Sequence, residues 1–230
     1  MTDRQDRAID TCRDPKVTLV LDELHRNARG DIWRFAGILP KLVAGRLKGH
    51  KMLDTLTPAM AREVYMPVSR EEGRFLYQIA RLIGARNIVE FGTSFGISTI
   101  YLAAAIKDNG GGKVVGTEIE PSKHETATAN LARAGLADCA DVRLGDALET
   151  LRESPHSIDM IFLDGWKDLY LPVLELLKPR MRAGGVVLAD NIHTFKTALR
   201  PFVDYLQSGE NGFISTTLSI SDGLEFSIRA

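Results

Sequence analysis

The chain has 230 residues and 44% of them are hydrophobic, which suits one α/β domain with an extension and argues against overall disorder. Lysine and arginine number 29 against 30 aspartate and glutamate, so the net charge of −1 gives no general field for nucleic acid or an anionic membrane. Cys12 and Cys139 lie far apart in no metal-type spacing, and no apolar run approaches membrane-spanning length, so a cytoplasmic protein is expected.

Residues 1–60 are expected to form a helical extension to a main domain over residues 61–230. Apolar residues recur at helical spacing over Val17–Asn27 and Asp31–Leu47, although Pro40 is expected to kink or divide the second helix. These helices need a surface to cover. The sheet domain, a substrate mouth and a second subunit of a homodimer are the three roles that the sequence leaves open.

From Ser69 onward, helical and strand patterns alternate. Ser69 and Glu72 form a capping box that opens a helix ending at Gly84. Strands are predicted at Ile88–Phe91, Lys113–Glu118, Asp141–Leu144, Ile158–Leu163, Gly185–Ala189, Phe213–Ser219 and Leu224–Arg229. Helices are predicted at Ile97–Lys107, Ser122–Ala134, Ala147–Glu153, Leu169–Arg182 and Thr194–Gln207.

Repeated β-α-β units predict an α/β fold with a doubly wound, mostly parallel, seven-stranded Rossmann-like sheet. The last two strands are joined by the short turn Ser221-Asp222-Gly223. Strands joined so closely cannot be parallel, so one antiparallel strand is expected near an edge.

The turn after the first strand contains Gly92 and Gly96. Glycine permits positive φ and close approach by a ligand, and the following helix presents free amides and a positive dipole end. The spacing is Gly-x-x-x-Gly and lacks the three-glycine fingerprint of pyrophosphate binding, so a nucleoside cofactor without phosphates fits better than a dinucleotide. A turn that only joins strand to helix is the alternative.

Ligands of such sheets bind at the carboxyl ends of the strands. The polar candidates there are Glu90, Glu118, Asp146, Asp164–Tyr170 and Asp190–Asn191. Glu118 can accept hydrogen bonds from both hydroxyls of a ribose, although a single acid at a strand end is also commonly just solvated.

Four motifs resemble the cation-dependent S-adenosylmethionine O-methyltransferases, the family of catechol and caffeoyl-coenzyme A O-methyltransferases. They are Ser69-Arg-Glu-Glu-Gly-Arg-Phe-Leu76, Val89-Glu-Phe-Gly-Thr-Ser-Phe-Gly96, Asp164-Gly-Trp-Lys-Asp-Leu-Tyr170 and Leu188-Ala-Asp-Asn191. The resemblance runs from about Met66 to the C-terminus and implies a class I methyltransferase fold. The cofactor-binding residues it implies are Glu90, Gly92, Ser98, Glu118, Ile119, Asp146, Ala147, Asp164 and Trp166.

The same resemblance makes Asp164, Asp190 and Asn191 ligands of Mg²⁺ or another divalent cation. Two carboxylates and an amide are hard oxygen donors, which agrees with that assignment. Adjacent strand residues point to opposite faces, so Asp190 and Asn191 can share an ion only if the strand ends there and the chain turns. The alternative is that this pair caps the helix that starts near Thr194.

Lys167 follows Asp164 by three residues, and the resemblance makes it the catalytic base. An ammonium that is partly buried near a divalent cation loses its proton more readily, so Lys167 could take a proton from a substrate hydroxyl. A surface ion pair with Asp168 is the alternative.

Two positions depart from the catechol enzyme. The substrate-contacting glutamate of that enzyme falls near Thr216 or Thr217, and its histidine on the adenine side of the cofactor is replaced by Gly165. The substrate is therefore not inherited from the resemblance.

The sequence thus predicts a metal-dependent O-methyltransferase that uses S-adenosylmethionine and a hydroxylated, catechol-like small molecule. The rivals are a nicotinamide-dependent oxidoreductase, disfavoured by the glycine spacing, and a non-catalytic cofactor-binding module.

Overall fold

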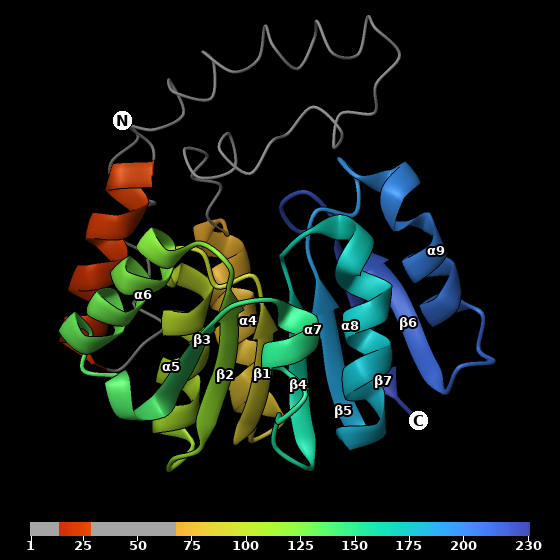
Figure 1. Ribbon diagram of the computed structural model, residues 1–230, viewed down its shortest axis with the longest axis horizontal. Helices are drawn as coiled ribbons and strands as arrows, with labels where there is room; N and C mark the ends of the chain where they lie inside the picture. Colours follow the sequence, from red (N-terminus) through yellow and green to blue (C-terminus); the bar gives the residue numbers. More distant parts are fainter. Residues whose placement is uncertain (1–13, 29–67) are drawn as a thin grey trace, which may run out of the picture.

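The computed structural model describes residues 14–28 and 68–230 (Figure 1). In this part of the chain seven strands form one sheet in the order β3-β2-β1-β4-β5-β7-β6. The strands are β1 Asn87–Phe91, β2 Lys113–Glu118, β3 Ala140–Leu144, β4 Ile158–Leu163, β5 Met181–Ala189, β6 Phe213–Leu218 and β7 Leu224–Arg229. Strand β7 runs antiparallel to both of its neighbours and the other pairs are parallel, which confirms the predicted single antiparallel strand near an edge.

Helices cover both faces of the sheet. They are α4 Arg70–Leu82, α5 Ile97–Asp108, α6 Pro121–Arg133, α7 Ala147–Thr150, α8 Tyr170–Leu177 and α9 Lys196–Gln207. Side chains of β1 alternate between two buried clusters, with Ile88 on the side of α4, α5 and α6 and Val89 on the side of α7, α8 and α9. This alternation is the pleat of a strand that is buried on both faces.

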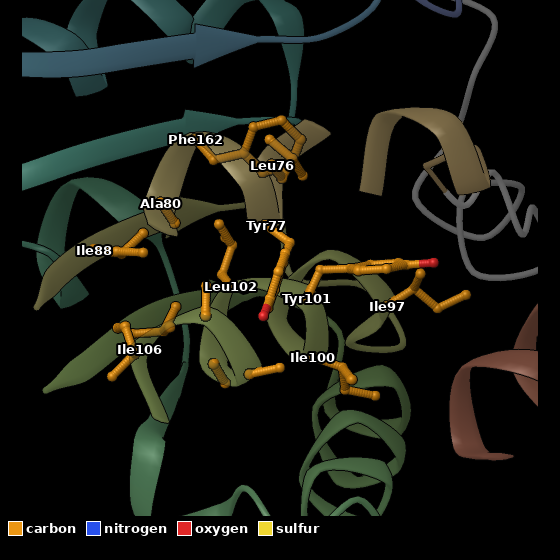
Figure 2. Packing of buried hydrophobic residues seen from close by; sticks show 14 of the residues in the cluster. Leu76, Tyr77, Ala80, Ile88, Ile97, Ile100, Tyr101, Leu102, Ile106 and Phe162 are labelled. Carbon is orange, nitrogen blue, oxygen red and sulfur yellow. The ribbon is translucent and has the colours of Figure 1, made fainter. Parts of the chain in front are cut away.

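Helices α4 and α5 pack against each other in the first cluster and supply eleven of its 27 buried residues (Figure 2). Helix α4 begins as the capping box predicts, because Ser69 Oγ accepts a hydrogen bond of 3.0 Å from the Glu72 amide. The two helices approach closely at Gly73, where an added Cβ would lie 2.2 Å from the Tyr101 ring. The start of α4, and with it Glu72, is therefore fixed against α5.

A helix over residues 15–28 packs on the same side of the domain, beside α5 and α6 (Figure 1). Its apolar residues Val17, Val20, Leu21 and Leu24 join the first cluster. Ion pairs between Asp14 and Lys107 of α5 and between Glu23 and Arg133 of α6 connect it to these helices. The helix predicted at Asp31–Leu47 lies outside the described residues. Within the described ranges, no helix has the length and apolar character needed to cross a membrane.

The helix predicted at Leu169–Arg182 was too long, and the strand predicted at Gly185–Ala189 was too short. Helix α8 ends at Leu177, a 3-10 turn covers Lys178–Arg180, and β5 already begins at Met181. Pro179 explains the early end, since proline has no N–H to donate to the Glu175 carbonyl four residues back.

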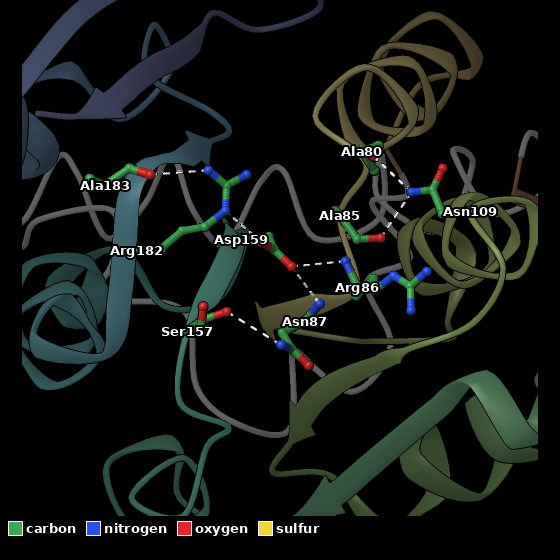
Figure 3. A network of polar contacts seen from close by, with 9 residues as sticks. All are labelled: Ala80, Ala85, Arg86, Asn87, Asn109, Ser157, Asp159, Arg182 and Ala183. Atoms are coloured by element: carbon green, nitrogen blue, oxygen red, sulfur yellow. Dashed lines mark hydrogen bonds and ion pairs between the residues drawn. The ribbon is translucent and has the colours of Figure 1, made fainter.

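A polar network then holds the extended start of β5 beside β1 and β4 (Figure 3). Arg182 Nε donates to Asp159 Oδ1 at 2.6 Å, and Asp159 Oδ2 accepts from the amides of Arg86 and Asn87, both at 2.8 Å. The network lies at the starts of the strands, opposite the end where ligands of such sheets bind.

The helix predicted at Ala147–Glu153 was also too long. Helix α7 ends at Thr150, whose carbonyl accepts from Arg143 Nη1 at 2.6 Å, while the Leu151 carbonyl accepts from Ser154 Oγ at 2.7 Å. These side chains satisfy carbonyl groups at the helix end, so the helix stops there.

Candidate active site

The predicted site residues come together at the carboxyl ends of β1, β2, β4 and β5. The turn after β1 and the loop after β4 touch there through their backbones, since a Cβ at Gly92 would lie 2.6 Å from the Gly165 nitrogen. Gly92 also has a φ of 96°, which L side chains rarely adopt. Glycine is required at this position both for its conformation and for the close contact.

Glu90 is fully buried beneath the glycine turn. Its Oε2 accepts hydrogen bonds from Thr93 Oγ1 at 2.8 Å and Thr99 Oγ1 at 2.5 Å, whereas its Oε1 has no partner among the described residues. Burial raises the pKa of Glu90 to about 7. A buried acceptor without a donor is costly, and the ammonium of an amino-acid ligand would satisfy it.

Glu118 lies at the end of β2 and is almost fully buried. Its Oε2 accepts from the Ser94 amide at 2.8 Å and its Oε1 from the Glu120 amide at 2.9 Å. These bonds fix the carboxylate and also hold Ser94, whose φ is 50°. Each oxygen still has a second lone pair that a hydroxyl group could use. Ile119, the next residue, is 61% exposed and offers an apolar surface beside it.

The remaining predicted cofactor residues surround this region. Asp146 caps α7, because its Oδ1 accepts from the Leu148 amide at 2.8 Å, and Ala147 is buried beside it. Ser98 is buried in the first turn of α5 near the Glu90 carboxyl, and it acts to lower the pKa of that group. Trp166 is partly buried on the loop after β4 and packs on the second apolar cluster.

Strand β5 ends one residue before Asp190, and the chain turns at Asn191. Asn191 has a φ of 66°, in the left-handed region that asparagine tolerates better than most residues. Its side-chain Nδ2 donates to Asp190 Oδ2 at 2.8 Å. The two side chains therefore lie together, which meets the condition that the sequence set for a shared ion. Helix α9 starts later, at Lys196, and the structure gives it no side-chain cap.

Asp164 and Asp190 form a desolvated pair of carboxylates. Burial raises the pKa of Asp164, and burial together with the charge of Asp164 raises the pKa of Asp190 to about 7. Lys167 supplies the positive charge that acts on both of them. A divalent cation would stabilise both ionised groups, so this donor set fits a hard metal ion.

Lys167 is only 7% exposed and its ammonium points into the site. Its Nζ lies 3.4 Å from Asp164 Oδ1 and donates to Tyr170 Oη at 2.7 Å. Tyr170 in turn donates to the Asp190 carbonyl at 3.3 Å. The ion pair is thus with Asp164, and the alternative pairing with the exposed Asp168 is not what the structure shows.

Two residues of this site were given no role of their own by the sequence reasoning. Tyr170 ties Lys167 to the end of β5, and Glu72 brings a further buried carboxylate whose charge is felt by Tyr170. Tyr170 stood at the end of a motif and could have been singled out. Glu72 was interpreted only as part of a helix cap, and nothing in its local sequence indicates that α4 would begin beside the ends of β4 and β5.

The comparisons with known proteins agree with this geometry. A family model described as a methyltransferase domain matches residues 89–192. A catechol O-methyltransferase of Niastella koreensis is 36% identical over 129 residues, which cover 54% of this chain and 58% of the relative. Caffeoyl-CoA O-methyltransferase 1 of Eucalyptus globulus is 34% identical over 131 residues, 55% of this chain and 52% of the relative.

The chain therefore spans little more than half the length of the curated relatives it matches. Among solved structures, an O-methyltransferase from Bacillus cereus in complex with SAH aligns with a TM-score of 0.67 and 29% identity, over 75% of this chain and 86% of that chain.

The described part of the chain has the class I methyltransferase fold, and residues 89–192 match the methyltransferase-domain model. More narrowly, its sequence and fold are similar to those of O-methyltransferases of the catechol and caffeoyl-CoA type.

Proposed function

We propose that this protein transfers a methyl group from S-adenosylmethionine to a hydroxyl of a small aromatic molecule with neighbouring oxygens, using a divalent cation. One observation carries the proposal. The glycine turn above the unpartnered Glu90 Oε1 is in backbone contact with the loop that bears Asp164 and Lys167. A cofactor held at the turn and a substrate held at the loop would therefore be neighbours.

The cofactor would supply the reactive methyl group on a cationic sulfur. Glu90 would accept a hydrogen bond from its ammonium beside Gly92 and Ser98, and Glu118 would accept hydrogen bonds from the ribose hydroxyls. The adenine ring of the cofactor would lie between Ile119 and Trp166, with Asp146 and Ala147 at its edge. Burial of these polar groups makes them strong and selective partners.

Asp164, Asp190 and Asn191 would hold the cation, Mg²⁺ or another divalent ion. Bound there, it would lower the pKa of a substrate hydroxyl and orient that oxygen. Lys167 would take the proton of that hydroxyl at its Nζ, the atom that Tyr170 and Asp164 already position. Its burial keeps water away from the proton acceptor.

The alternatives account for less of this geometry. A nicotinamide enzyme would not use a turn that lacks the pyrophosphate fingerprint. A module that only binds a cofactor has no use for a buried lysine between two buried carboxylates, which costs desolvation energy. The relatives named as O-methyltransferases support the same choice.

Calorimetry with S-adenosylhomocysteine (SAH), with and without Mg²⁺, tests the proposal. SAH should bind, Mg²⁺ should bind as well, and NAD⁺ should not. Chelator should then abolish methyl transfer to a catechol without preventing SAH binding. Binding of NAD⁺ in place of SAH, or full activity in excess chelator, would refute the proposal.

A further inference from the structure

Glu72 is a buried carboxylate that the proposed reaction does not use. It lies in the first turn of α4 and is 1% exposed, and its Oε1 has no hydrogen-bond partner among the described residues. The Ser69 amide and the Ser221 hydroxyl lie near the carboxylate and act to lower its pKa. One of its oxygens is therefore buried without compensation, which costs free energy unless something else binds there.

The surroundings of Glu72 indicate what that partner is. Burial and the charges of Asp190 and Asp164 raise the pKa of Glu72 to about 9. The positive charge of Lys167 acts on both aspartates. Three carboxylates against one ammonium leave a formal charge of −2 if all are ionised, which a divalent cation would balance.

Hydrogen bonds also connect the start of α4, which carries Glu72, to the chain that follows Asp190 and Asn191. Ser69 Oγ and Ser221 Oγ are 2.5 Å apart, so α4 is tied to the turn between β6 and β7. In that turn, the Gly223 carbonyl accepts a hydrogen bond of 3.1 Å from the Ile192 amide, and the Asp222 carbonyl accepts one of 2.9 Å from the His193 amide. The start of α4, which carries Glu72, is thus tied through this turn to the chain that follows Asp190 and Asn191.

We propose that Glu72 is an outer carboxylate of the cation site, which acts on the ion through its charge and through water and is not one of its direct ligands. In the described ranges, no three histidine, cysteine, aspartate or glutamate side chains are close enough to share a metal ion, so a direct third carboxylate ligand does not fit. The inference rests on the proposed cation dependence and adds to it a positioning residue outside the resembled ligand set.

The test is Mg²⁺ affinity of the full-length protein at one fixed pH, measured by calorimetry. Glu72→Gln keeps the shape and removes the charge, and it should weaken Mg²⁺ binding by about tenfold or more, the usual effect of losing an outer partner of a metal site. Glu72→Asp keeps the charge and should recover part of the affinity. The matched control is Glu71→Gln, which removes an exposed carboxylate from the same helical turn and should change the affinity less than about twofold.

SAH affinity and the thermal midpoint without Mg²⁺ are measured on the same proteins. Both should be nearly unchanged in Glu72→Gln, because the substitution is isosteric. Equal Mg²⁺ affinities of wild type and Glu72→Gln would overturn the inference alone. Weaker SAH binding with unchanged Mg²⁺ binding would also overturn it, by placing Glu72 against the cofactor. Absence of Mg²⁺ binding to the wild type would instead overturn the cation site itself.

Discussion

Burial of the Glu90 carboxylate lowers the stability of the ligand-free protein and leaves a hydrogen-bond acceptor for a ligand. The carboxyl of Glu90 has a pKa of about 7 in the folded protein against 4.5 when unfolded, because it is completely buried. Between these values the folded state holds a proton that the unfolded state has lost, so stability falls as the pH rises from 4.5 to 7 and the loss is complete above 7. The difference corresponds to roughly 3 kcal/mol of unfolding free energy, on the order of 1.4 kcal/mol per pKa unit.

Glu90→Gln should remove this pH dependence. In the ligand-free protein, the variant should gain stability relative to wild type as the pH rises from 4.5 to 7, by up to roughly 3 kcal/mol. SAH should raise the stability of wild type more than that of the variant, because its ammonium would pair with the glutamate. Urea unfolding at several pH values, with and without SAH, measures both effects. Parallel pH profiles would show that Glu90 does not titrate as described.

Lys167 gives a second test at a single residue. Lys167→Met should lower kcat by roughly 100-fold or more, the usual range for a general base. Its Mg²⁺ affinity should be kept or raised, since a positive charge 3.4 Å from Asp164 is removed. The control is Lys167→Arg, which keeps the charge but cannot lose its proton, so it should be inactive as well. An active Lys167→Arg enzyme would mean that only the charge matters.

Single residues also mark the limit of sequence reasoning. The condition for a shared ion at Asp190–Asn191 could be stated from strand geometry, and the left-handed φ of Asn191 meets it. Glu72 could not be found in the same way. Its importance depends on its electrostatic interaction with Asp164 and Asp190, 92 and 118 residues further along the chain, and local patterns contain no information on such distant pairs.

At the level of elements, the loop after β4 is shaped by its packing on β1. An added Cβ at Gly165 would lie 2.5 Å from the Phe91 ring, and that ring packs edge-on against Tyr170 with ring centroids 6.3 Å apart. Glycine at the position of the catechol enzyme's histidine is therefore explained by Phe91. A larger side chain would push the ring toward Tyr170, which positions Lys167.

Gly165→Ala should accordingly destabilise the fold by roughly 1–3 kcal/mol, as overpacking of a tight site does. Phe91→Leu in the same chain should restore part of that loss, because leucine leaves room for the methyl group. Unfolding free energies of the two single variants and the double variant give the coupling between the positions. Additive effects would show that the two residues do not share this space.

The elements themselves could largely be predicted from hydrophobic periodicity. The strand predicted at Lys113–Glu118 and the helix predicted to open after Ser69 agree with β2 and α4. The errors fell at helix ends, where α8 stops at Leu177 and α7 at Thr150. There the deciding forces are a proline and side-chain hydrogen bonds from Arg143 and Ser154, which override an apolar pattern that could have continued.

At the scale of the whole molecule, the sheet topology is what makes a site. The order β3-β2-β1-β4-β5 places the ends of β1 and β4 side by side, at the point where the chain reverses its direction of winding. Charged residues between Glu72 and Asp190 are thereby gathered at one edge, over the two apolar clusters that pack on the sheet. The helix over residues 15–28 lies on one flank of this sheet and adds to its core.

The arrangement of this edge leads to a prediction about the substrate. Asp164, Asp190 and Asn191 would fill three positions of an octahedral ion, so two substrate oxygens and one water could fill the others. Phe195 lies beside Lys167, the proposed proton acceptor, with its ring centre 5.5 Å from Lys167 Nζ, and gives this side of the site an aromatic surface. A ring that carries two neighbouring hydroxyls matches both features, whereas a single hydroxyl would lose one of its two points of attachment.

A matched pair of substrates, a catechol and the same molecule without the second hydroxyl, provides the measurement. The catechol should be methylated with a kcat/KM about 100-fold higher or more, because two attachment points hold the attacking oxygen in line with the methyl group and loss of that orientation is costly. The preference should shrink in Asn191→Ala, which alters the ion's coordination, while SAH binding stays unchanged. Comparable rates on both substrates in the wild type would rule out two-point attachment, even if the reaction proved to depend on a metal.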